Sequence, residues 1–332
     1  MTKEKRTFYP MKFCQINLDG VSLKHIQVGN INYQYELNSV PNYSDSRIIV
    51  NISGEVIRKD FEPLFSGDET GYIEHQNQFF YRNCNTVVNT EGHELFYRGK
   101  FFNSFLQINW KKHNDIVTIN INVTNAYLAE SRSRLSRSSK FDALINHLIM
   151  HFSVTLGYIP FHAGAVNVGE SSSTLLMGLP NTGKTTTALK ISEDRGTAFI
   201  AEDIVFVDKK DLLVYSCPFT MNPKSPERFT AHSYIGHSLE SIIILNRSDD
   251  KPYVKDLGIE TLQRMVTNMN YFEFTWMHDV QIRHLFFQGD TSLSNVTLAY
   301  LEGQKEICER VSGIELGGNT PSAWNELLKN KI

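Results

Sequence analysis

The chain has 332 residues, of which 41% are hydrophobic and 21% are charged. This length and composition exclude a largely disordered protein and favour about two domains with sizeable cores. The formal net charge of −3 gives no overall attraction to nucleic acid or to an anionic membrane, so neither is expected as the main partner.

Cysteine spacing and apolar patterning indicate the compartment. The four cysteines lie far apart, without a Cys-x-x-Cys pair or a matching histidine pair, so neither zinc nor a disulfide framework is expected. They are Cys14, Cys84, Cys217 and Cys308. The basic N-terminus is not followed by an apolar run, and polar residues interrupt the apolar stretch 147–166. We therefore expect a soluble, cytoplasmic protein without a signal peptide.

Short runs rich in Val, Ile, Tyr and Phe follow one another from about residue 12 to 124, separated by turn residues. The clearest strands are predicted at 48–52, 79–81, 94–97 and 116–121. The pattern predicts an antiparallel, β-rich N-terminal domain over residues 1–125. It contains no cluster that indicates chemistry.

Residues 131–140 carry four cationic side chains and no acid, and they precede a helical apolar pattern over 141–149. Two interpretations are open for this basic segment. It could dock an anionic substrate or phosphate, or it could be a solvated linker that leads into the helix.

The second half, 126–332, has a different pattern. A strand is predicted over 161–168 and another over 174–177, followed by a glycine-rich loop and by a helix around 186–191. Further strands are predicted at 198–201, 204–207, 241–245 and 295–300. The expected fold class is α+β or α/β, with a mixed sheet and flanking helices in this half.

The loop 178–185 reads Gly-Leu-Pro-Asn-Thr-Gly-Lys-Thr, which matches the Gly-x₄-Gly-Lys-Ser/Thr pattern of a P-loop. Glycines let the backbone turn its N–H groups towards phosphate, Lys184 reaches the β- and γ-phosphates, and the Thr185 hydroxyl binds Mg²⁺. We expect ATP or another nucleoside triphosphate, with Mg²⁺. The residues expected to bind it are Gly178, Pro180, Asn181, Thr182, Gly183, Lys184, Thr185 and Thr186.

Phosphoryl transfer also needs a carboxylate for the metal and a group that takes the acceptor's proton. The strand 199–201 ends in Glu202 and Asp203, which we assign to the base and to Mg²⁺ respectively, although the two roles could be exchanged. The pair could also be a solvated turn between two strands. His162, within the first strand of this half, is either a core histidine or a further catalytic residue.

These motifs together resemble the HPr kinase/phosphorylase-like P-loop kinases, whose nucleotide site is related to that of phosphoenolpyruvate carboxykinase. The resemblance covers roughly 155–300 and follows the order 161–163, 178–185 and 199–203, extended by 213–215 with Pro218 and by 241–245. It implies that His162, Lys184, Glu202 and Asp203 are catalytic and that Thr185 and Asp203 contact the metal. The family usually has two aspartates where this chain has Glu202 first, which lengthens the base by one methylene.

The resemblance implies an ATP- and Mg²⁺-dependent kinase that acts on a hydroxyl. The acceptor would be Ser or Thr of a small protein or precursor peptide, because the β-rich front half does not match the N-terminal domain of the enzymes that act on HPr. A homo-oligomer is compatible with the resemblance. The alternatives are a non-transferring nucleotide-binding regulatory protein or ATPase, and a small-molecule kinase or carboxykinase-like enzyme.

Overall fold

The computed structural model describes most of the chain in two compact units, Met1–Phe152 with Trp276–Val296, and Ser153–Thr275 with Thr297–Ile332. The described residues are 5–21, 46–54, 65, 70–75, 78–83, 85–89, 93–99, 103–131, 140–169, 171–217, 235–248, 251–273 and 292–318. Most of the basic segment, residues 132–139, lies outside them, as do Cys84 and Pro218. The predicted domain boundary after residue 125 stays a prediction.

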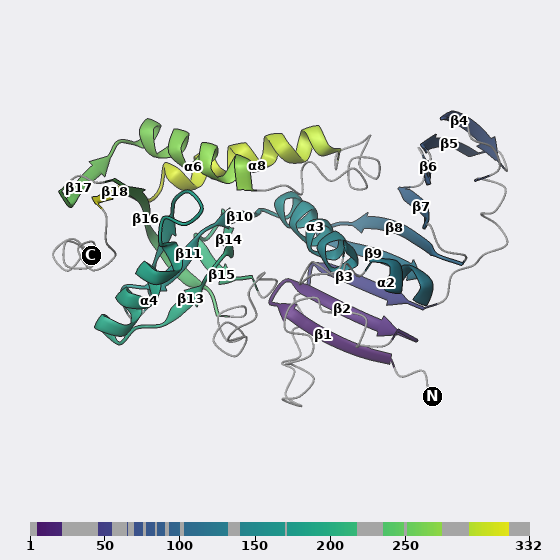
Figure 1. Cartoon of the computed structure of the whole chain (residues 1–332), viewed down its shortest axis with the longest axis horizontal. Helices are drawn as coiled ribbons and strands as arrows, with labels where there is room; N and C mark the ends of the chain where they lie inside the picture. The colour runs from purple at the N-terminus through teal and green to yellow at the C-terminus, as the bar shows by residue number, and fades with distance from the viewer. Residues whose placement is uncertain are drawn as a thin grey trace. The chain divides into compact units, whose positions relative to one another are not determined.

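The first unit contains a nine-stranded sheet in the order β1-β2-β3-β9-β8-β7-β6-β5-β4 (Figure 1). Its strands are β1 (Lys5–Met11), β2 (Cys14–Asp19), β3 (Ile48–Ser53), β4 (Gly71–His75), β5 (Gln78–Asn83), β6 (Thr86–Asn89), β7 (Glu94–Arg98), β8 (Phe105–His113) and β9 (Ile116–Val123). The sheet is mixed, not antiparallel throughout as predicted, because β3 runs parallel to both β2 and β9, whereas the other strand pairs are antiparallel. Successive side chains point to opposite faces of any strand, so apolar alternation marks a half-buried strand without fixing the direction of its neighbour.

Among the described residues, this unit includes helix α2 (Asn125–Ser131) and most of helix α3 (Lys140–Thr155). The predicted apolar stripe of α3 is buried, and Phe152 packs against Trp110 of β8 with ring centroids 5.1 Å apart. The buried faces of β2, β3 and β9 provide the rest of this core, through residues such as Ile16, Val50 and Ile119.

The second unit contains another nine-stranded mixed sheet, in the order β10-β14-β15-β16-β12-β11-β13, and β18 pairs with both β16 and β17. Its strands are β10 (Tyr158–His162), β11 (Gly164–Asn167), β12 (Ser172–Met177), β13 (Phe199–Ala201), β14 (Ile204–Asp208), β15 (Leu213–Ser216), β16 (His237–Arg247), β17 (Tyr253–Leu257) and β18 (Ser312–Gly318). β16 runs parallel to β12 on one side and to β18 on the other. The carboxyl ends of these three strands therefore lie at one edge of the sheet.

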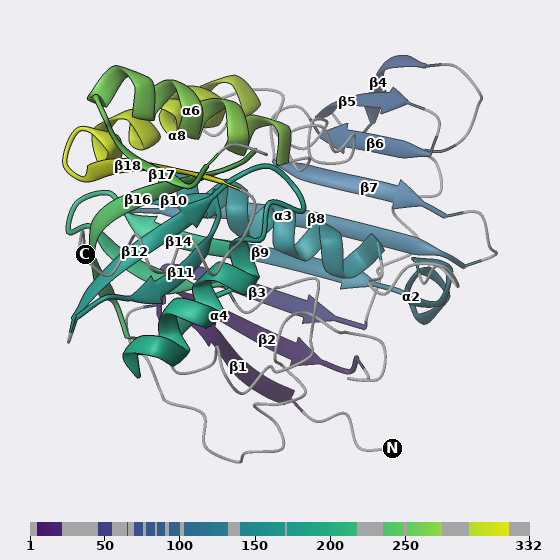
Figure 2. The same cartoon turned by 60° about the vertical axis from the view of Figure 1, so that its left-hand side comes forward.

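Helix α4 (Lys184–Arg195) follows β12 and packs on β11 and β12 (Figure 2). Ala188 and Ile191 of α4 join a buried cluster with Leu176, Ile243 and Leu316 from three parallel strands. On this core the end of β12 and the start of α4 are held on either side of the glycine-rich loop.

Helices α6 (Ile259–Glu273) and α8 (Leu293–Cys308) lie side by side in both views (Figures 1 and 2), and Gln263 of α6 donates to the backbone oxygen of Lys305 in α8 at 3.5 Å. The strand predicted at 295–300 is wrong, because these residues form part of α8. Its β-branched residues favour a strand locally, but Val296 and Tyr300 are buried four residues apart, which is helical spacing. The Ser292 hydroxyl accepts the N–H of Asn295 at the start of the helix.

The remaining strand predictions are close to the described bounds. The strand predicted over 161–168 is instead two strands, β10 and β11, with Ala163 between them. Of the helices that the structure describes, none contains an apolar stretch long enough to span a membrane.

Candidate functional site

The glycine-rich loop joins β12 to α4 in a shape that its residue types allow. A Cβ on Gly178 would stand 2.6 Å from the Thr182 hydroxyl and 3.0 Å from the backbone oxygen of Leu245, so the turn leaves no room for a side chain. Asn181 and Gly183 both have positive φ, at 64° and 96°. Asparagine and glycine are the residues that adopt this conformation most readily, and here they bend the loop around the end of the helix.

The N-terminus of α4 is open to an anion. Its N-cap is Gly183, which offers no side-chain hydrogen bond, and the first helical bond runs from the Thr187 N–H to the Gly183 oxygen at 2.9 Å. The three N–H groups of residues 184–186 precede that bond and take no part in it. Such N–H groups, together with the helix dipole, favour binding of negative charge.

Lys184 is only 8% exposed, although lysine is normally a surface residue. Its Nζ donates to the backbone oxygens of Gly178 at 2.9 Å and Leu179 at 3.5 Å. The ammonium group is therefore held inside the curve of the loop by carbonyl oxygens, which a more strongly charged acceptor could replace.

A concavity of about 480 Å³ opens beside this loop. It is lined by His162, Pro180, Asn181, Gly183, Lys184, Thr185, Thr186, Glu202 and Asp203. All the residues predicted to be catalytic or metal-binding are thus brought to one place from three segments of the chain. Gly178 and Thr182 do not line it, and Thr182 instead closes the loop by donating its hydroxyl to the Leu179 oxygen at 2.8 Å.

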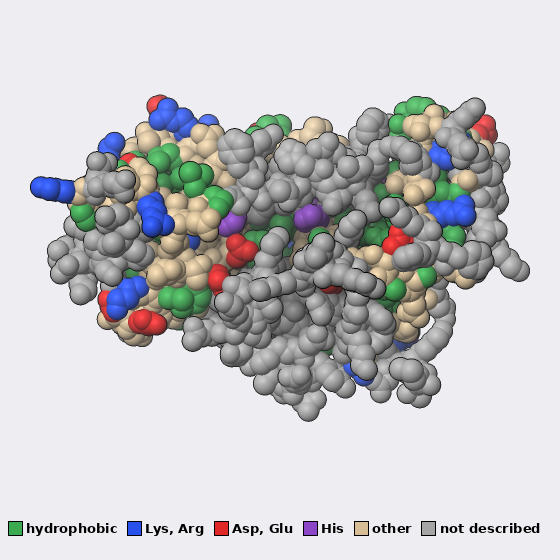
Figure 3. Space-filling view, in the orientation of Figure 1, with side chains coloured by type: hydrophobic (Ala, Val, Ile, Leu, Met, Phe, Trp, Pro, Cys, Tyr) green, Lys and Arg blue, Asp and Glu red, His purple; other side chains and the backbone are tan. Residues whose placement is uncertain are grey.

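His162 and Asp203 form a contact across this concavity. His162 Nε2 lies 3.2 Å from Asp203 Oδ1, and the two side chains are 20% and 29% exposed. The backbone supports the contact, because the N–H of Ala163 donates to the Asp203 oxygen at 3.0 Å. Figure 3 shows a histidine beside acidic side chains at the surface where Figure 1 labels β10 and β14.

Glu202 and Asp203 lie in the bend between β13 and β14, not within a strand. Inside a strand, adjacent side chains would point to opposite faces. Because β13 ends at Ala201, that alternation ends too, and both carboxylates line the concavity. Two acids with one histidine, one lysine and a hydroxyl can bind a divalent cation and accept a proton.

Within the described residues, no group of three or more His, Cys, Asp and Glu side chains gathers as a dedicated metal cage would require. One or two carboxylates suffice for Mg²⁺ when phosphate oxygens complete its coordination. The Thr185 hydroxyl and the Asp203 carboxylate lie in the same concavity and match that type of site.

Two further residues at this site were not identified from the sequence. Arg247, at the carboxyl end of β16, donates from Nη1 to the Asn181 oxygen of the loop at 3.4 Å. Asn270 of α6 accepts the backbone N–H of His162 at 3.0 Å through its Oδ1. The parallel pairing of β16 with β12 could have indicated Arg247, but no local pattern connects Asn270 to a residue 108 positions away.

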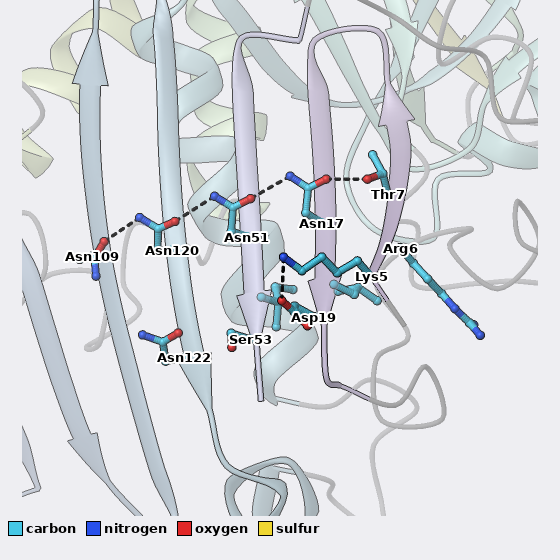
Figure 4. Close-up of a pocket in the computed structure, with 12 residues that line it drawn as sticks. Lys5, Arg6, Thr7, Asn17, Asp19, Asn51, Ser53, Asn109, Asn120 and Asn122 are labelled. Carbon is cyan, nitrogen blue, oxygen red and sulfur yellow. Dashed lines mark hydrogen bonds and ion pairs between the residues drawn. The ribbon is translucent and has the colours of Figure 1, made fainter. Parts of the chain in front are cut away.

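A second concavity, of about 680 Å³, lies on the sheet of the first unit; five asparagines line it, together with Lys5, Arg6, Asp19 and neighbouring residues (Figure 4). Asn17 donates to Asn51, Asn51 to Asn120 and Asn120 to Asn109, at 2.8 to 2.9 Å, and Thr7 donates to Asn17 at the other end. The amides bond to one another across four strands, and Thr7 extends the row to a fifth. This row therefore holds the sheet together, and it holds no titratable group suited to catalysis.

Comparison with known proteins gives no match from which a function could be inferred. A scan against models of protein families finds none that matches the chain, and a search of curated proteins finds no match.

Proposed function

We propose that this protein is a kinase that transfers the γ-phosphoryl group of ATP, with Mg²⁺, to a hydroxyl of a small protein or precursor peptide. The observation that carries the proposal is the concavity in which the loop 178–185 meets His162, Glu202 and Asp203. A phosphate-binding loop alone would fit any nucleotide-binding protein. Carboxylates beside it supply what transfer to a neutral hydroxyl needs in addition.

Phosphate binding would use groups that the loop already presents. Lys184 Nζ would exchange the Gly178 carbonyl oxygen for phosphate oxygens, and the N–H groups at the start of α4 would donate to them. Thr185 and Asp203 would hold Mg²⁺, which, when bound, neutralises charge on the transferred group. The residues present fit this cation because both offer hard oxygen ligands.

The chemical step assigns one role to each remaining side chain. The acceptor oxygen bonds to the γ-phosphorus, the bond from that phosphorus to the bridging oxygen of ADP breaks, and Glu202 accepts the hydroxyl proton. His162 orients the Asp203 carboxylate through the 3.2 Å contact. The roles of Glu202 and Asp203 can be exchanged in this scheme, and the variants described in the Discussion separate them.

The proposal includes an HPr kinase-like P-loop fold for the second unit and a cytoplasmic location. The order β10, β11, β12, loop, α4 and β13 supports it, since His162 precedes the loop and the acids follow it as in the family pattern. Precursor peptides are preferred to HPr as the acceptor because the N-terminal unit is a nine-stranded mixed sheet with no counterpart among the family motifs.

Incubation with γ-labelled ATP and a cell extract, followed by mass spectrometry of the labelled species, tests the proposal. We expect label on Ser or Thr of a peptide or small protein. Lys184→Ala should weaken ATP binding by about 10- to 10²-fold, because hydrogen bonds to charged groups contribute about 1.5–3 kcal/mol. The control is Lys190→Ala, which removes an exposed lysine of the same helix that pairs with Asp194.

Each other outcome selects an alternative. Labelled free phosphate alone would make the protein an ATPase or a nucleotide-dependent regulator, and a labelled metabolite would make it a small-molecule kinase. Equal ATP affinity in Lys184→Ala and Lys190→Ala would contradict the assignment of the loop itself.

A further inference from the structure

Among the described strands, β10, which ends in His162, lies at the edge of its sheet and pairs only with β14 on its inner side. The Ala163 N–H points to that side, where it donates to the Asp203 oxygen. In an antiparallel pair the backbone of alternate residues faces away from the partner strand, so His162 and Pro160 face outwards. Pro160 has no N–H to donate, and proline is confined to such edge positions in sheets.

The outward N–H of His162 is met by a side chain from helix α6. Asn270 Oδ1 accepts it at 3.0 Å, and Asn270 is 0% exposed. Among the described residues its Nδ2 has no hydrogen-bond partner. A buried amide costs free energy unless it is hydrogen-bonded, so the contact with His162 is the interaction that stabilises Asn270 at this depth.

The position of Asn270 on α6 is otherwise suited to an apolar residue. Leu262, Val266 and Asn270 are the fully buried residues spaced four apart along the helix, and α6 packs against β10. A leucine at 270 would continue this stripe. The amide instead connects the helix to the end of the strand that carries the site histidine.

We propose that Asn270 is a positioning residue for the candidate site. By holding the outward N–H of His162 while the neighbouring N–H of Ala163 bonds to Asp203, it holds the end of β10 from the outer side. This keeps the His162 imidazole opposite the Asp203 carboxylate. The consequence for catalysis rests on the proposed kinase function, whereas the anchoring of the strand end does not.

The anchoring is tested without any activity. In protein labelled with ¹⁵N-histidine, the His162 amide resonance is assigned by its loss in His162→Gln, and its exchange with deuterium is followed. Asn270→Leu removes the acceptor and should raise the exchange rate about 10-fold or more, whereas Asn270→Asp keeps an acceptor oxygen and should retain protection. Asn270→Ala serves as the second acceptor-free variant if the leucine variant does not fold.

The catalytic consequence is tested by kinetics on the same variants. Displacement of a site group by about 1 Å costs up to 10²-fold in rate, so Asn270→Leu should lower kcat by about 10- to 10²-fold and leave KM for ATP within about twofold. Asn270→Asp should restore much of that loss. The control is Gln304→Leu, which removes an equally buried amide of α8 that lies beside Tyr300.

Three results would overturn the proposal. The first is slow His162 exchange in both acceptor-free variants, and the second is an equal loss of kcat in Gln304→Leu. The third is fast exchange with unchanged kcat. If the parent transfers no phosphoryl group, the proposed function fails, and the exchange measurement still decides whether Asn270 anchors the strand.

Discussion

Glu202 and Asp203 are chemically similar neighbours, but their surroundings differ in a way that separates their roles. Asp203 contacts His162 through its side chain and Ala163 through its backbone oxygen, so its position is fixed twice. A metal ligand benefits from such fixation, because Mg²⁺ demands near-ideal geometry. Glu202 lines the same concavity on a side chain that is one methylene longer, which suits it to reach a substrate proton.

The roles of the two carboxylates can be distinguished by replacing each one with its amide. Glu202→Gln keeps the shape but removes the basicity, so kcat should fall by about 10²- to 10⁴-fold while the affinity for ATP survives. Asp203→Asn should instead weaken Mg²⁺-dependent nucleotide binding, because a neutral amide is a poorer ligand for a hard cation. Titration calorimetry at several Mg²⁺ concentrations and steady-state kinetics provide both readings. The opposite pattern would exchange the two roles.

Ionisation of the buried Tyr215 hydroxyl is expected to destabilise the second unit at alkaline pH. Burial, then the neighbouring Tyr158 and two aspartates, raises the pKa of its hydroxyl from 10 to about 12. The neutral form is thus favoured in the folded state. Its contribution to stability is fully present below pH 10 and is lost as the pH rises through about 12.

We therefore expect Tyr215→Phe to reduce the loss of stability between pH 10 and pH 12. Urea unfolding at a series of pH values measures this loss directly. Tyr72→Phe is the matched control, because Tyr72 is 69% exposed. Parallel pH profiles for the parent and Tyr215→Phe would show that Tyr215 does not cause the alkaline decline.

At the scale of elements, the amide row of the first unit sets the register of five strands. Thr7, Asn17, Asn51, Asn120 and Asn109 are direct partners in successive strand pairs, so their side chains stand in one line. A shift of one residue in any strand would turn its amide to the apolar face. The row therefore stabilises this pairing and disfavours the alternatives.

Asn51 occupies the middle of the row, where it both accepts from Asn17 and donates to Asn120. Asn51→Ala leaves one donor and one acceptor without a partner, so it should cost about 1–3 kcal/mol in free energy of unfolding. Asn122→Ala removes a single bond to Gln107 and should cost about 0.5–1.5 kcal/mol. Urea midpoints compare the losses of stability in the two variants. Equal losses would show that Asn51, in the middle of the row, contributes no more than Asn122.

At the scale of the whole molecule, the chain contains two units that each have a nine-stranded sheet and a core of their own. The concavity of the candidate nucleotide site is lined by residues of the second unit, between 162 and 203. A ligand that binds only the folded state stabilises the unit that holds it, by about 2.7 kcal/mol at a concentration of 100 times its Kd.

Hydrogen exchange with mass spectrometry should show where that stabilisation falls. With Mg²⁺ and a non-hydrolysable ATP analogue, we expect slower exchange in peptides from 158–208 and unchanged exchange in peptides from 103–123. Lys184→Ala should reduce the difference at the same nucleotide concentration, whereas Lys190→Ala should keep it. Protection confined to the first unit would place nucleotide binding outside the candidate site.

Local chemistry in the sequence was enough to predict several features. Apolar alternation predicted strands such as β3 and β9, and helical spacing predicted α3, because burial of one face requires these periods. The spacing of two glycines, a lysine and a threonine indicated a turn into a helix N-terminus. The segment 295–300 was misassigned, because β-branched residues favour strands locally whereas packing of Val296 and Tyr300 on one face favours a helix.

The sequence by itself determined which residue types could bind phosphate, because the conformations of glycine and the reach of lysine are local properties. Only the tertiary structure decided which residues share a site. The parallel direction of β2, β3 and β9, the row of asparagines across them, and the contact of Asn270 with His162 depend on strand pairing and helix packing between distant segments. Strand alternation is the same for parallel and antiparallel neighbours, so no local pattern encodes these choices.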